Sequence, residues 1–334
     1  MADGNTTSTP LMDLVDGNAT VAINGTMVAE TVAMGSLVVL LTVFGIPGNA
    51  VIVISMVINP KLQTVANIFV LNIAAADLSV ILLLLFCVPA LGYGHWPTAL
   101  GSVGCSIFGF LFTACCIAST YSLAATALNR WCLIVYPSRY HKTFTMRRSV
   151  AILAGLWVLA VVLSIPLVAG WGAIRYKPEI FMCTFDSNGA APYTIFIVIA
   201  GTIIPLAVTA KCYIQLFWTV HRTQDRVNQR RSSVSSMSSN QADKQRLGKK
   251  LLAALIVFVT CWGPYAVGML VATYRHVEGW VHVVTVWLAL IESGLNAIIY
   301  GFMNSQLQAA YKEMFTRWKA VRKEKASSPE PTPV

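Results

Sequence analysis

The hydrophobic pattern of this chain consists of long runs without a charged residue, separated by short polar segments. Residues 31–60, 78–129, 149–174, 187–210 and 251–274 contain no Asp, Glu, Lys or Arg. A helix needs about 20 apolar residues to cross the hydrocarbon core of a bilayer. The pattern therefore predicts an all-α membrane protein, a bundle of seven transmembrane helices near residues 32–57, 67–91, 102–135, 147–170, 192–219, 247–273 and 280–303.

The positive charges lie on one side of this predicted bundle. Residues 1–30 contain no Lys or Arg, and the loops on the same side contain only Arg175, Lys177 and Arg275. Apart from Lys211 inside a span, the other 20 of the 24 Lys and Arg residues lie on the opposite side. Short loops rich in Lys and Arg stay in the cytoplasm. We therefore expect a protein of the cell membrane with an extracellular N-terminus and a cytoplasmic C-terminus.

The composition agrees with this topology and excludes several classes of function. Only 11% of the residues are charged, against about 25% in soluble proteins, so lipid is the solvent for much of the chain. The net charge of +10 follows the topology, which indicates contact with anionic membrane lipids and no nucleic-acid partner. The sequence contains no cluster of nucleophile and base or of metal ligands, so we expect no enzymatic activity.

The predicted bundle divides the chain into four parts. Residues 1–31 form an extracellular segment with N-glycosylation sequons at Asn5, Asn18 and Asn24. Residues 32–303 form the membrane domain, whose inner loop at 222–246 has the composition of a disordered segment. Residues 304–318 have the pattern of a short amphipathic eighth helix on the inner leaflet, and residues 319–334 form a disordered cytoplasmic tail.

A few residues inside the spans carry candidate chemistry. Ionisable groups within a membrane are expensive and mark functional sites, and the side chains of Asp77 and Glu292 are too short to reach an interface. Six of the eight cysteines fall within spans, whereas Cys105 and Cys183 lie at outer, oxidising positions. We therefore predict a disulfide bond between Cys105 and Cys183.

Short motifs follow one another in order along the predicted spans. They are GNAVIV with Asn49, LNIAAADL with Asp77, NRW with Arg130, CWGP with Trp262, and NAIIY with Tyr300. Together they resemble the motifs of the rhodopsin-like (class A) G-protein-coupled receptors. The resemblance implies a receptor that passes an extracellular stimulus to a heterotrimeric G protein, with arrestin and receptor kinases as further partners.

Within this family the chain resembles the melatonin-receptor branch and its orphan relatives. YKPEIFMCTF at 176–185, Asn129 before Arg130, and Ala297 in place of Pro carry the likeness, which implies the inhibitory class of G protein. Leu167 and Arg175 stand where melatonin receptors bind their ligand through Asn and Gln. This difference disfavours melatonin itself, although a melatonin-type receptor remains an alternative.

Other receptors of the family respond to amines or to light, and the residues at the corresponding positions bear on both stimuli. Phe112 replaces the Asp with which amine receptors bind an ammonium group, and Leu290 replaces the lysine to which opsins attach retinal. An opsin-like light sensor with a non-covalent chromophore is kept as an alternative. A transporter or channel is disfavoured, because the two halves of the chain show no repeat.

The resemblance implies an outer cavity lined by mostly aromatic and apolar side chains. Such a lining suits a small hydrophobic ligand, and the basic residues at the rim favour an amphiphile with an anionic head. The alternative is that these rim charges are simply solvated. The predicted lining is Phe108, Phe112, Cys115, Arg175, Phe196, Trp262, Tyr265 and Leu290.

The resemblance also implies a polar core below this cavity. Asp77, Ser119, Ser293 and Asn296 match the positions that hold a sodium ion in many members of the family, and hard oxygen ligands suit that ion. Glu292 adds a second carboxylate, and two carboxylates in one dry cavity are not both charged cheaply. We expect a response to sodium or to pH, and no other cofactor.

The last group of candidates governs activation and G-protein coupling. In the family, Arg130 pairs with acids at the positions of Asn129 and Lys244 in the inactive state, and here both acids are missing. A weaker inactive state predicts elevated basal signalling. The residues assigned to this machinery are Asn129, Arg130, Trp131, Tyr213, Lys244, Pro264 and Tyr300.

Overall fold

The structure is a computed structural model that describes residues 17–186, 191–230, 238–303, 307–309 and 316. Within these residues, seven helical spans are long and apolar enough to cross a membrane, which confirms the predicted fold class. The spans are Val28–Ile58, Val65–Tyr93, Gly101–Val135, Met146–Leu167, Ala191–Arg222, Leu252–Ala272 and Gly279–Gly301.

Several spans consist of more than one helical segment, and prolines mark the joints. Pro47, Pro89 and Pro166 each lie at the first or second position of a segment, where their missing N–H costs no hydrogen bond. The segments are α1 Gly17–Leu40, η1 Leu41–Gly45, α2 Ile46–Ile58, η2 Pro60–Leu62, α3 Val65–Leu84, η3 Leu85–Cys87, α4 Val88–Tyr93, α5 Gly101–Val135, α6 Pro137–Thr143, α7 Met146–Ser164, η4 Ile165–Leu167, η5 Pro178–Ile180, α8 Ala191–Val198, η6 Ile199–Ile203, α9 Ile204–Arg230, α10 Ser238–Ala272 and α11 Gly279–Met303.

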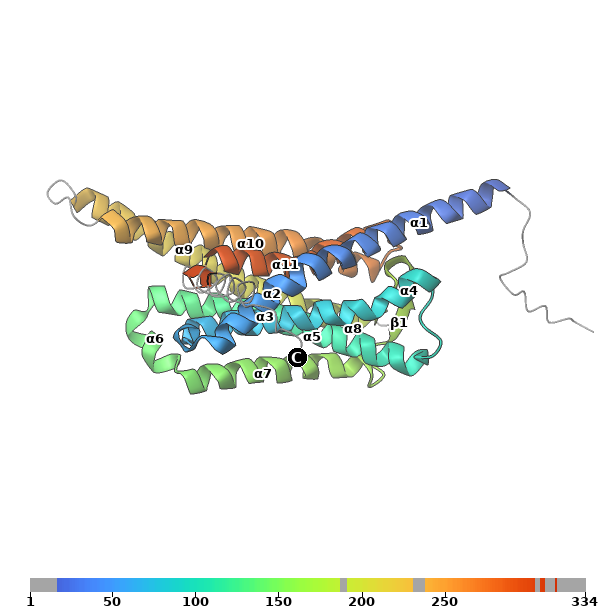
Figure 1. Ribbon diagram of the computed structural model, residues 1–334, viewed down its shortest axis with the longest axis horizontal. Helices are drawn as coiled ribbons and strands as arrows, with labels where there is room; N and C mark the ends of the chain where they lie inside the picture. Colours follow the sequence, from blue (N-terminus) through green and yellow to red (C-terminus); the bar gives the residue numbers. More distant parts are fainter. Residues whose placement is uncertain (1–16, 187–190, 231–237, 304–306, 310–315, 317–334) are drawn as a thin grey trace, which may run out of the picture.

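The helices run side by side along the long axis of the molecule (Figure 1). The long helix α5 packs against α3, α7 and α9, and α11 packs against α10 and α3. At one end, a hairpin of β1 (Ile174–Lys177) and β2 (Met182–Phe185) pairs Tyr176 with Cys183 in antiparallel register. The α6 segment and the far ends of α9 and α10 lie at the other end (Figure 1).

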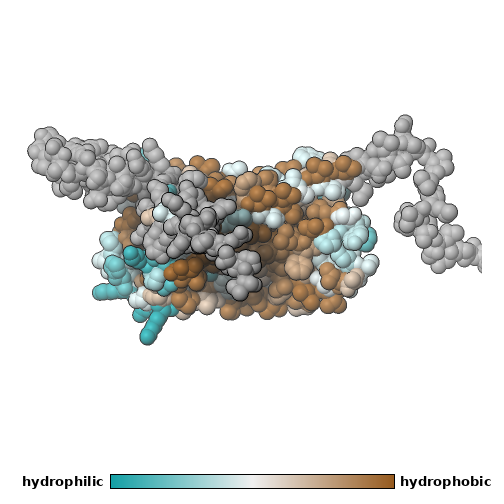
Figure 2. Space-filling model, viewed as in Figure 1, coloured by the Kyte–Doolittle hydropathy of each residue, from teal (hydrophilic) through white to brown (hydrophobic). Residues whose placement is uncertain are grey.

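The surface has the polarity that a membrane protein requires. Figure 2 shows hydrophobic residues along the middle of the molecule and hydrophilic residues toward its two ends. Large apolar side chains such as Phe44, Val158 and Val267 are more than half exposed, because lipid takes the place of water around them. Polar side chains such as Asp77 and Glu292 are instead buried inside the bundle, as expected for ionisable groups at membrane depth.

The structure shows longer helices than the predicted spans at two places. The first membrane span, predicted near residues 32–57, is Val28–Ile58, and its helix extends back to Gly17, so the sequon residues Asn18 and Asn24 lie within α1. The inner loop, predicted to be disordered over 222–246, is helical at 222–230 and 238–246. Residues of good helix propensity such as Gln, Arg and Lys let a helix continue into water without an apolar face.

Other predicted segments lie outside the described residues. These are Asn5, residues 231–237 of the inner loop, the tail at 319–334, and most of the predicted eighth helix. Within 304–318, only residues 307–309 and 316 are described, and they are helical, with Leu307 fully buried.

One glycine sets the distance between two spans and provides a test of the packing. A Cβ atom on Gly48 would lie 2.9 Å from the Cβ of Ala297, an atom fixed to the α11 backbone. We expect Gly48→Ala to force α2 and α11 apart and to lower the free energy of unfolding by about 1 kcal/mol, despite the better helix propensity of Ala. The melting temperature of the purified protein measures this effect.

The matched control is Gly155→Ala. A Cβ atom on Gly155 in α7 would have no neighbour within 4 Å. This substitution should therefore leave the melting temperature unchanged or raise it. Equal melting temperatures for the two variants would contradict the close contact between α2 and α11.

Candidate functional site

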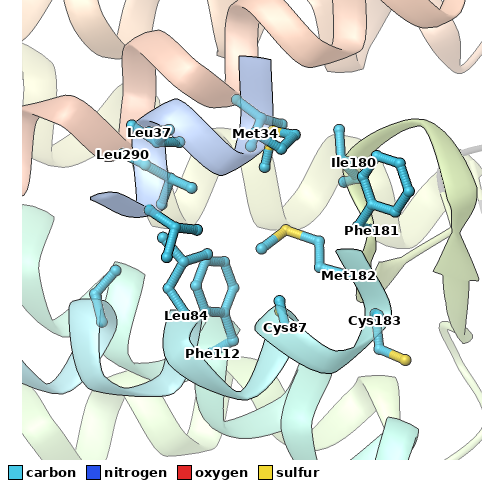
Figure 3. Close-up of a cluster of buried hydrophobic side chains, with 14 of the residues drawn as sticks. Met34, Leu37, Leu84, Cys87, Phe112, Ile180, Phe181, Met182, Cys183 and Leu290 are labelled. Carbon is cyan, nitrogen blue, oxygen red and sulfur yellow. The ribbon is translucent and has the colours of Figure 1, made fainter. Parts of the chain in front are cut away.

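A disulfide bond fixes the outer hairpin over the helix bundle. Cys105 near the start of α5 is bonded to Cys183 in β2, 78 positions along the chain, which confirms the predicted pairing. Figure 3 shows the Met182 side chain of the hairpin segment extending toward Cys87 and Phe112 of the helices, with Phe181 beside Ile180. The hairpin therefore closes the outer end of the bundle with apolar side chains.

A cavity with a volume of about 80 Å³ for the centres of water molecules lies beneath this hairpin, and the total empty space is about 900 Å³ when the adjoining solvent is included. Its wall combines residues of α5, the outer hairpin, α8, η6, α10 and α11. The lining is Phe112, Thr113, Cys116, Ile117, Thr120, Lys177, Glu179, Ile180, Met182, Thr184, Phe185, Ile197, Val198, Gly201, Thr202, Trp262, Tyr265, Met269, His282, Val286, Ala289 and Leu290.

The structure brings half of the predicted lining residues to the cavity. Phe112, Trp262, Tyr265 and Leu290 all lie in its wall. Trp262 is 6% exposed, and its ring meets that of Tyr265 edge-on with centroids 5.7 Å apart. An aromatic floor of this kind responds to the size of whatever occupies the space above it.

Three apolar or thiol residues of the predicted lining face elsewhere. Phe108 packs between the rings of Trp96 and Phe112, and Phe196 packs against Trp171, with ring centroids 5.3 Å apart. Cys115 does not line the cavity, whereas its neighbour Cys116 does. The helical repeat explains this correction, because residues four apart share a face and Cys116 lies four positions after Phe112.

Arg175 is also absent from the cavity wall. Its side chain is 70% exposed, and its Nε atom lies 3.1 Å from Oδ2 of Asp186. Residues two apart on a strand share a face, and Arg175 and Lys177 both pair with Asp186, but the side chain of Arg175 stays at the surface. Arg175, predicted at the rim of the ligand site, is therefore not part of the cavity wall in this structure.

The mouth of the cavity contains ionisable groups from two elements. Lys177 and Glu179 come from the outer hairpin and His282 from α11. Nζ of Lys177 lies 3.0 Å from Oδ1 of Asp186. Nearby, burial raises the pKa of Tyr176 to about 12, with further contributions from Cys87 and Glu179, so this phenol stays neutral at physiological pH.

Below the floor of the cavity lies the predicted polar core. Asp77 is fully buried and accepts hydrogen bonds from Ser119 Oγ at 2.6 Å and from Asn296 Nδ2 at 3.0 Å. Glu292 is 2% exposed and has Asp77, Asn296 and Trp262 as its polar neighbours. Neither carboxylate forms an ion pair with a Lys, Arg or His in the described part of the chain. Two buried carboxylates therefore lie directly below the floor of the cavity.

Ser293 contributes to this core through its side chain, a hydrogen-bonding neighbour of Asp77, and through its backbone. Its carbonyl oxygen accepts a hydrogen bond of 3.0 Å from Asn49 Nδ2, and the same amide also donates to the carbonyl of Gly45. These bonds tie α2 to α11 at the level of the polar core.

At the inner end, Arg130 lies among aromatic residues. Its guanidinium carbon is 5.1 Å from the centre of the Tyr300 ring, a cation–π distance. Tyr213 and Tyr300 are buried, and their hydroxyl groups are hydrogen-bonding neighbours of each other. Across the described residues Arg130 forms no ion pair with an acid.

The neighbours of Arg130 have different partners. Nδ2 of Asn129 donates a hydrogen bond of 3.3 Å to the hydroxyl of Tyr140 in α6, and the Trp131 ring contacts that of Tyr136 with centroids 5.1 Å apart. Lys244 lies in α10, but its side chain is outside the described residues. Pro264 lies inside α10, two positions after Trp262, where it interrupts the helical hydrogen bonds.

Comparison with known proteins decides the family. The sequence model described as the seven-transmembrane receptors of the rhodopsin family matches residues 48–300, about three quarters of the chain. The chain belongs to this family. Its members are receptors and not enzymes, so the prediction of no enzymatic activity is confirmed, and they couple to heterotrimeric G proteins.

Individual relatives agree with this assignment. The chain is 29% identical over 296 residues to the melatonin receptor type 1C of Gallus gallus, covering 86% of this chain and 83% of the relative. It is 29% identical over 292 residues to the melatonin receptor type 1B-B of Danio rerio, with 85% and 81% coverage. Squid rhodopsin has the same fold, with a TM-score of 0.75 at 20% identity over 91% of this chain and 93% of that structure.

Proposed function

We propose that this receptor of the cell membrane binds a small, largely apolar ligand in the outer cavity and activates a heterotrimeric G protein at its inner end. The observation that carries the proposal is the position of Trp262. This residue lines the cavity and is also a neighbour of Glu292 in the polar core. A ligand that displaces the indole would thereby act on the core between α3 and α11, and through Tyr300 on Arg130.

The class of ligand follows from the wall of the cavity. Aromatic and aliphatic side chains form most of it, which suits a small hydrophobic molecule. Leu167 is buried in an apolar cluster and does not line the cavity, and Arg175 is exposed, so neither supplies a neutral hydrogen-bonding group to the cavity. A ligand that needs such groups is bound poorly when they are missing. We therefore propose a ligand other than melatonin.

A light sensor with a non-covalent chromophore is the second candidate. Leu290 lies in the cavity wall, and α11 contains no lysine between Gly279 and Met303, so a Schiff base with retinal has no site on this helix. A purified protein with an absorption band in the visible range would favour this candidate, and a colourless protein would exclude it.

Nucleotide exchange tests the proposed function. The purified receptor in lipid nanodiscs is mixed with individual Gα subunits and their βγ partners, and GDP release is followed with a fluorescent GTP analogue. We expect faster exchange than with empty nanodiscs for at least one Gα, first of all for the inhibitory class. No acceleration with any Gα, with or without candidate ligands, would contradict the proposal.

The orientation and the cytoplasmic partners belong to the same proposal. The distribution of Lys and Arg supports an extracellular N-terminus, with glycans on Asn5, Asn18 and Asn24. Arrestin and receptor kinases would bind on the cytoplasmic side, and anionic lipids would contact the basic inner segments.

We also propose that the polar core binds a sodium ion. The residues present fit this ion, because the carboxylates of Asp77 and Glu292 and the oxygen atoms of Ser119 and Asn296 lie together in one buried cluster. The two carboxylates and the absence of a basic partner among the described residues leave a negative charge that a cation or a proton must compensate. An ion here would stabilise the resting state.

Thermal unfolding in sodium and in potassium chloride tests this proposal. We expect sodium to raise the melting temperature of the wild-type protein, because an ion that binds only the folded state stabilises it. Glu292→Gln should weaken the sodium effect severalfold, and Asp77→Asn should abolish it. A sodium effect that is unchanged in Glu292→Gln would exclude a role for Glu292 in the site.

A further inference from the structure

The outer end of the cavity contains one acid with no basic partner in contact. Among the described lining residues, the charged and basic side chains are Lys177, Glu179 and His282. Lys177 forms an ion pair, whereas Glu179 forms none within the described part of the chain. Whether a ligand meets a net positive or a net negative charge at this end therefore depends on how far nearby acids cancel the charges of the basic residues.

Asp186 compensates the basic residues of the hairpin. One of its oxygens lies 3.0 Å from Lys177 Nζ and the other 3.1 Å from Arg175 Nε. The side chains of Lys177 and Asp186 are only 22% and 11% exposed, so their opposite charges largely cancel for a group inside the cavity. Arg175 is 70% exposed, and water and salt screen its charge.

A second acid reinforces the charge of Glu179. Glu179 lies in the short η5 turn between the two strands. A Cβ atom on Gly279, at the start of α11, would lie 3.5 Å from both the Cβ of Glu179 and an Oε atom of Glu30. Glu30 of α1 and Glu179 are thus close neighbours that interact electrostatically. His282, which lies at the same end of the cavity, is a neighbour of both Glu179 and Lys177.

Most of the remaining wall is apolar, with threonines as its main polar residues, and an environment of low polarity strengthens a charge interaction at the mouth. Phe112, Met182 and Leu290 belong to this wall. At the inner end, the side chain of Trp262 is 6% exposed and has Glu292 of the polar core as a hydrogen-bonding neighbour. The site therefore offers an acid at the outer end and a mostly apolar space between that acid and the Trp262 floor.

We infer that the ligand of this cavity is a compact hydrophobic molecule with a cationic group, such as a protonated amine, that binds Glu179. The inference rests on the proposed function, in which this cavity is the ligand site. It reverses the sign that the basic residues of the outer loops favour in the sequence, because Asp186 pairs with both Lys177 and Arg175 and Glu30 adds its negative charge to that of Glu179. It also differs from binding by an acid on α5, where Phe112 stands.

Direct binding of three matched probes tests the inference. Naphthylethylamine, naphthylethanol and naphthylacetic acid have the same aromatic body and a positive, neutral or negative head. Equilibrium dialysis against the purified full-length receptor measures their affinities. We expect the amine to bind about tenfold to a hundredfold more tightly than the other two, the range of a charge-assisted hydrogen bond in a partly buried site.

Three variants assign the effect to Glu179. Glu179→Gln should remove the preference for the amine, and Glu179→Lys should reverse it in favour of the acid. Glu278→Gln is the matched control, because Glu278 is exposed and does not line the cavity, and it should keep the wild-type preference. Melting temperatures without probe show whether each variant is folded.

The possible outcomes separate this inference from the proposed function. A preference for the acid or the alcohol, equal affinities, no binding of the amine, or an amine preference that survives Glu179→Gln would each overturn the inference. Dialysis needs no G protein, so the result is independent of nucleotide exchange. A receptor that selects the amine but activates no Gα would keep the inference and contradict the signalling function.

Discussion

We expect Cys183→Ser to lower the free energy of unfolding by about 2–4 kcal/mol. The bond between Cys105 and Cys183 closes a loop of 78 positions, and removing it gives the unfolded chain more freedom. The hairpin it anchors covers the cavity and contributes part of its wall. Thermal unfolding of the purified protein and the amount of receptor at the cell surface measure the loss.

The control is Cys132→Ser, which removes a free, half-buried thiol at the inner end of α5. This variant should unfold like the wild type. The double variant Cys105→Ser/Cys183→Ser should match Cys183→Ser alone, because the two cysteines act as one unit. A wild-type melting temperature for Cys183→Ser would show that the bond contributes nothing to stability.

The second large effect concerns signalling without ligand. We expect Asn129→Asp to reduce basal nucleotide exchange about tenfold, which corresponds to a shift of about 1.4 kcal/mol between the inactive and active states. The new carboxylate would lie beside Arg130 and attract its guanidinium, which now lies over the ring of Tyr300. Basal GDP release in nanodiscs, normalised to receptor concentration, measures the effect.

A second variant isolates the role of charge. Asn129 donates a hydrogen bond to Tyr140, so Tyr140→Phe removes this bond without placing an acid beside Arg130. Basal exchange should remain high in Tyr140→Phe. Unchanged basal exchange in a folded Asn129→Asp variant, or an equal loss in Tyr140→Phe, would contradict the explanation by a missing acid.

The membrane spans could be predicted from the sequence because each one is a local property. A run such as 31–60 has no charge and is longer than a bilayer is thick, whatever its neighbours are. The inner ends of α9 and α10 could not be predicted in the same way. Their composition indicates disorder, yet polar residues with adequate helix propensity continue the helices into water.

The residues of the site show the same difference between what local sequence predicts and what only the folded structure decides. Trp262 and Tyr265 were predicted from a motif, and both line the cavity. Cys115 and Cys116 are chemically identical neighbours, and only the rotation of α5 decides that the second one faces the cavity. The role of Arg175 depends on Asp186, 11 positions away in the chain, which the antiparallel pairing of β1 with β2 brings to 3.1 Å from the Arg175 side chain.

The sequence by itself determined the seven crossings, the cysteines that pair, and the polar residues that the membrane must enclose, because hydrophobic length and the cost of burying charge depend on composition alone. The tertiary structure decided which face of each helix borders the cavity and which charges remain uncompensated there. Those properties depend on distances between segments far apart in the chain, such as Glu30 to Glu179 and Asp77 to Asn296.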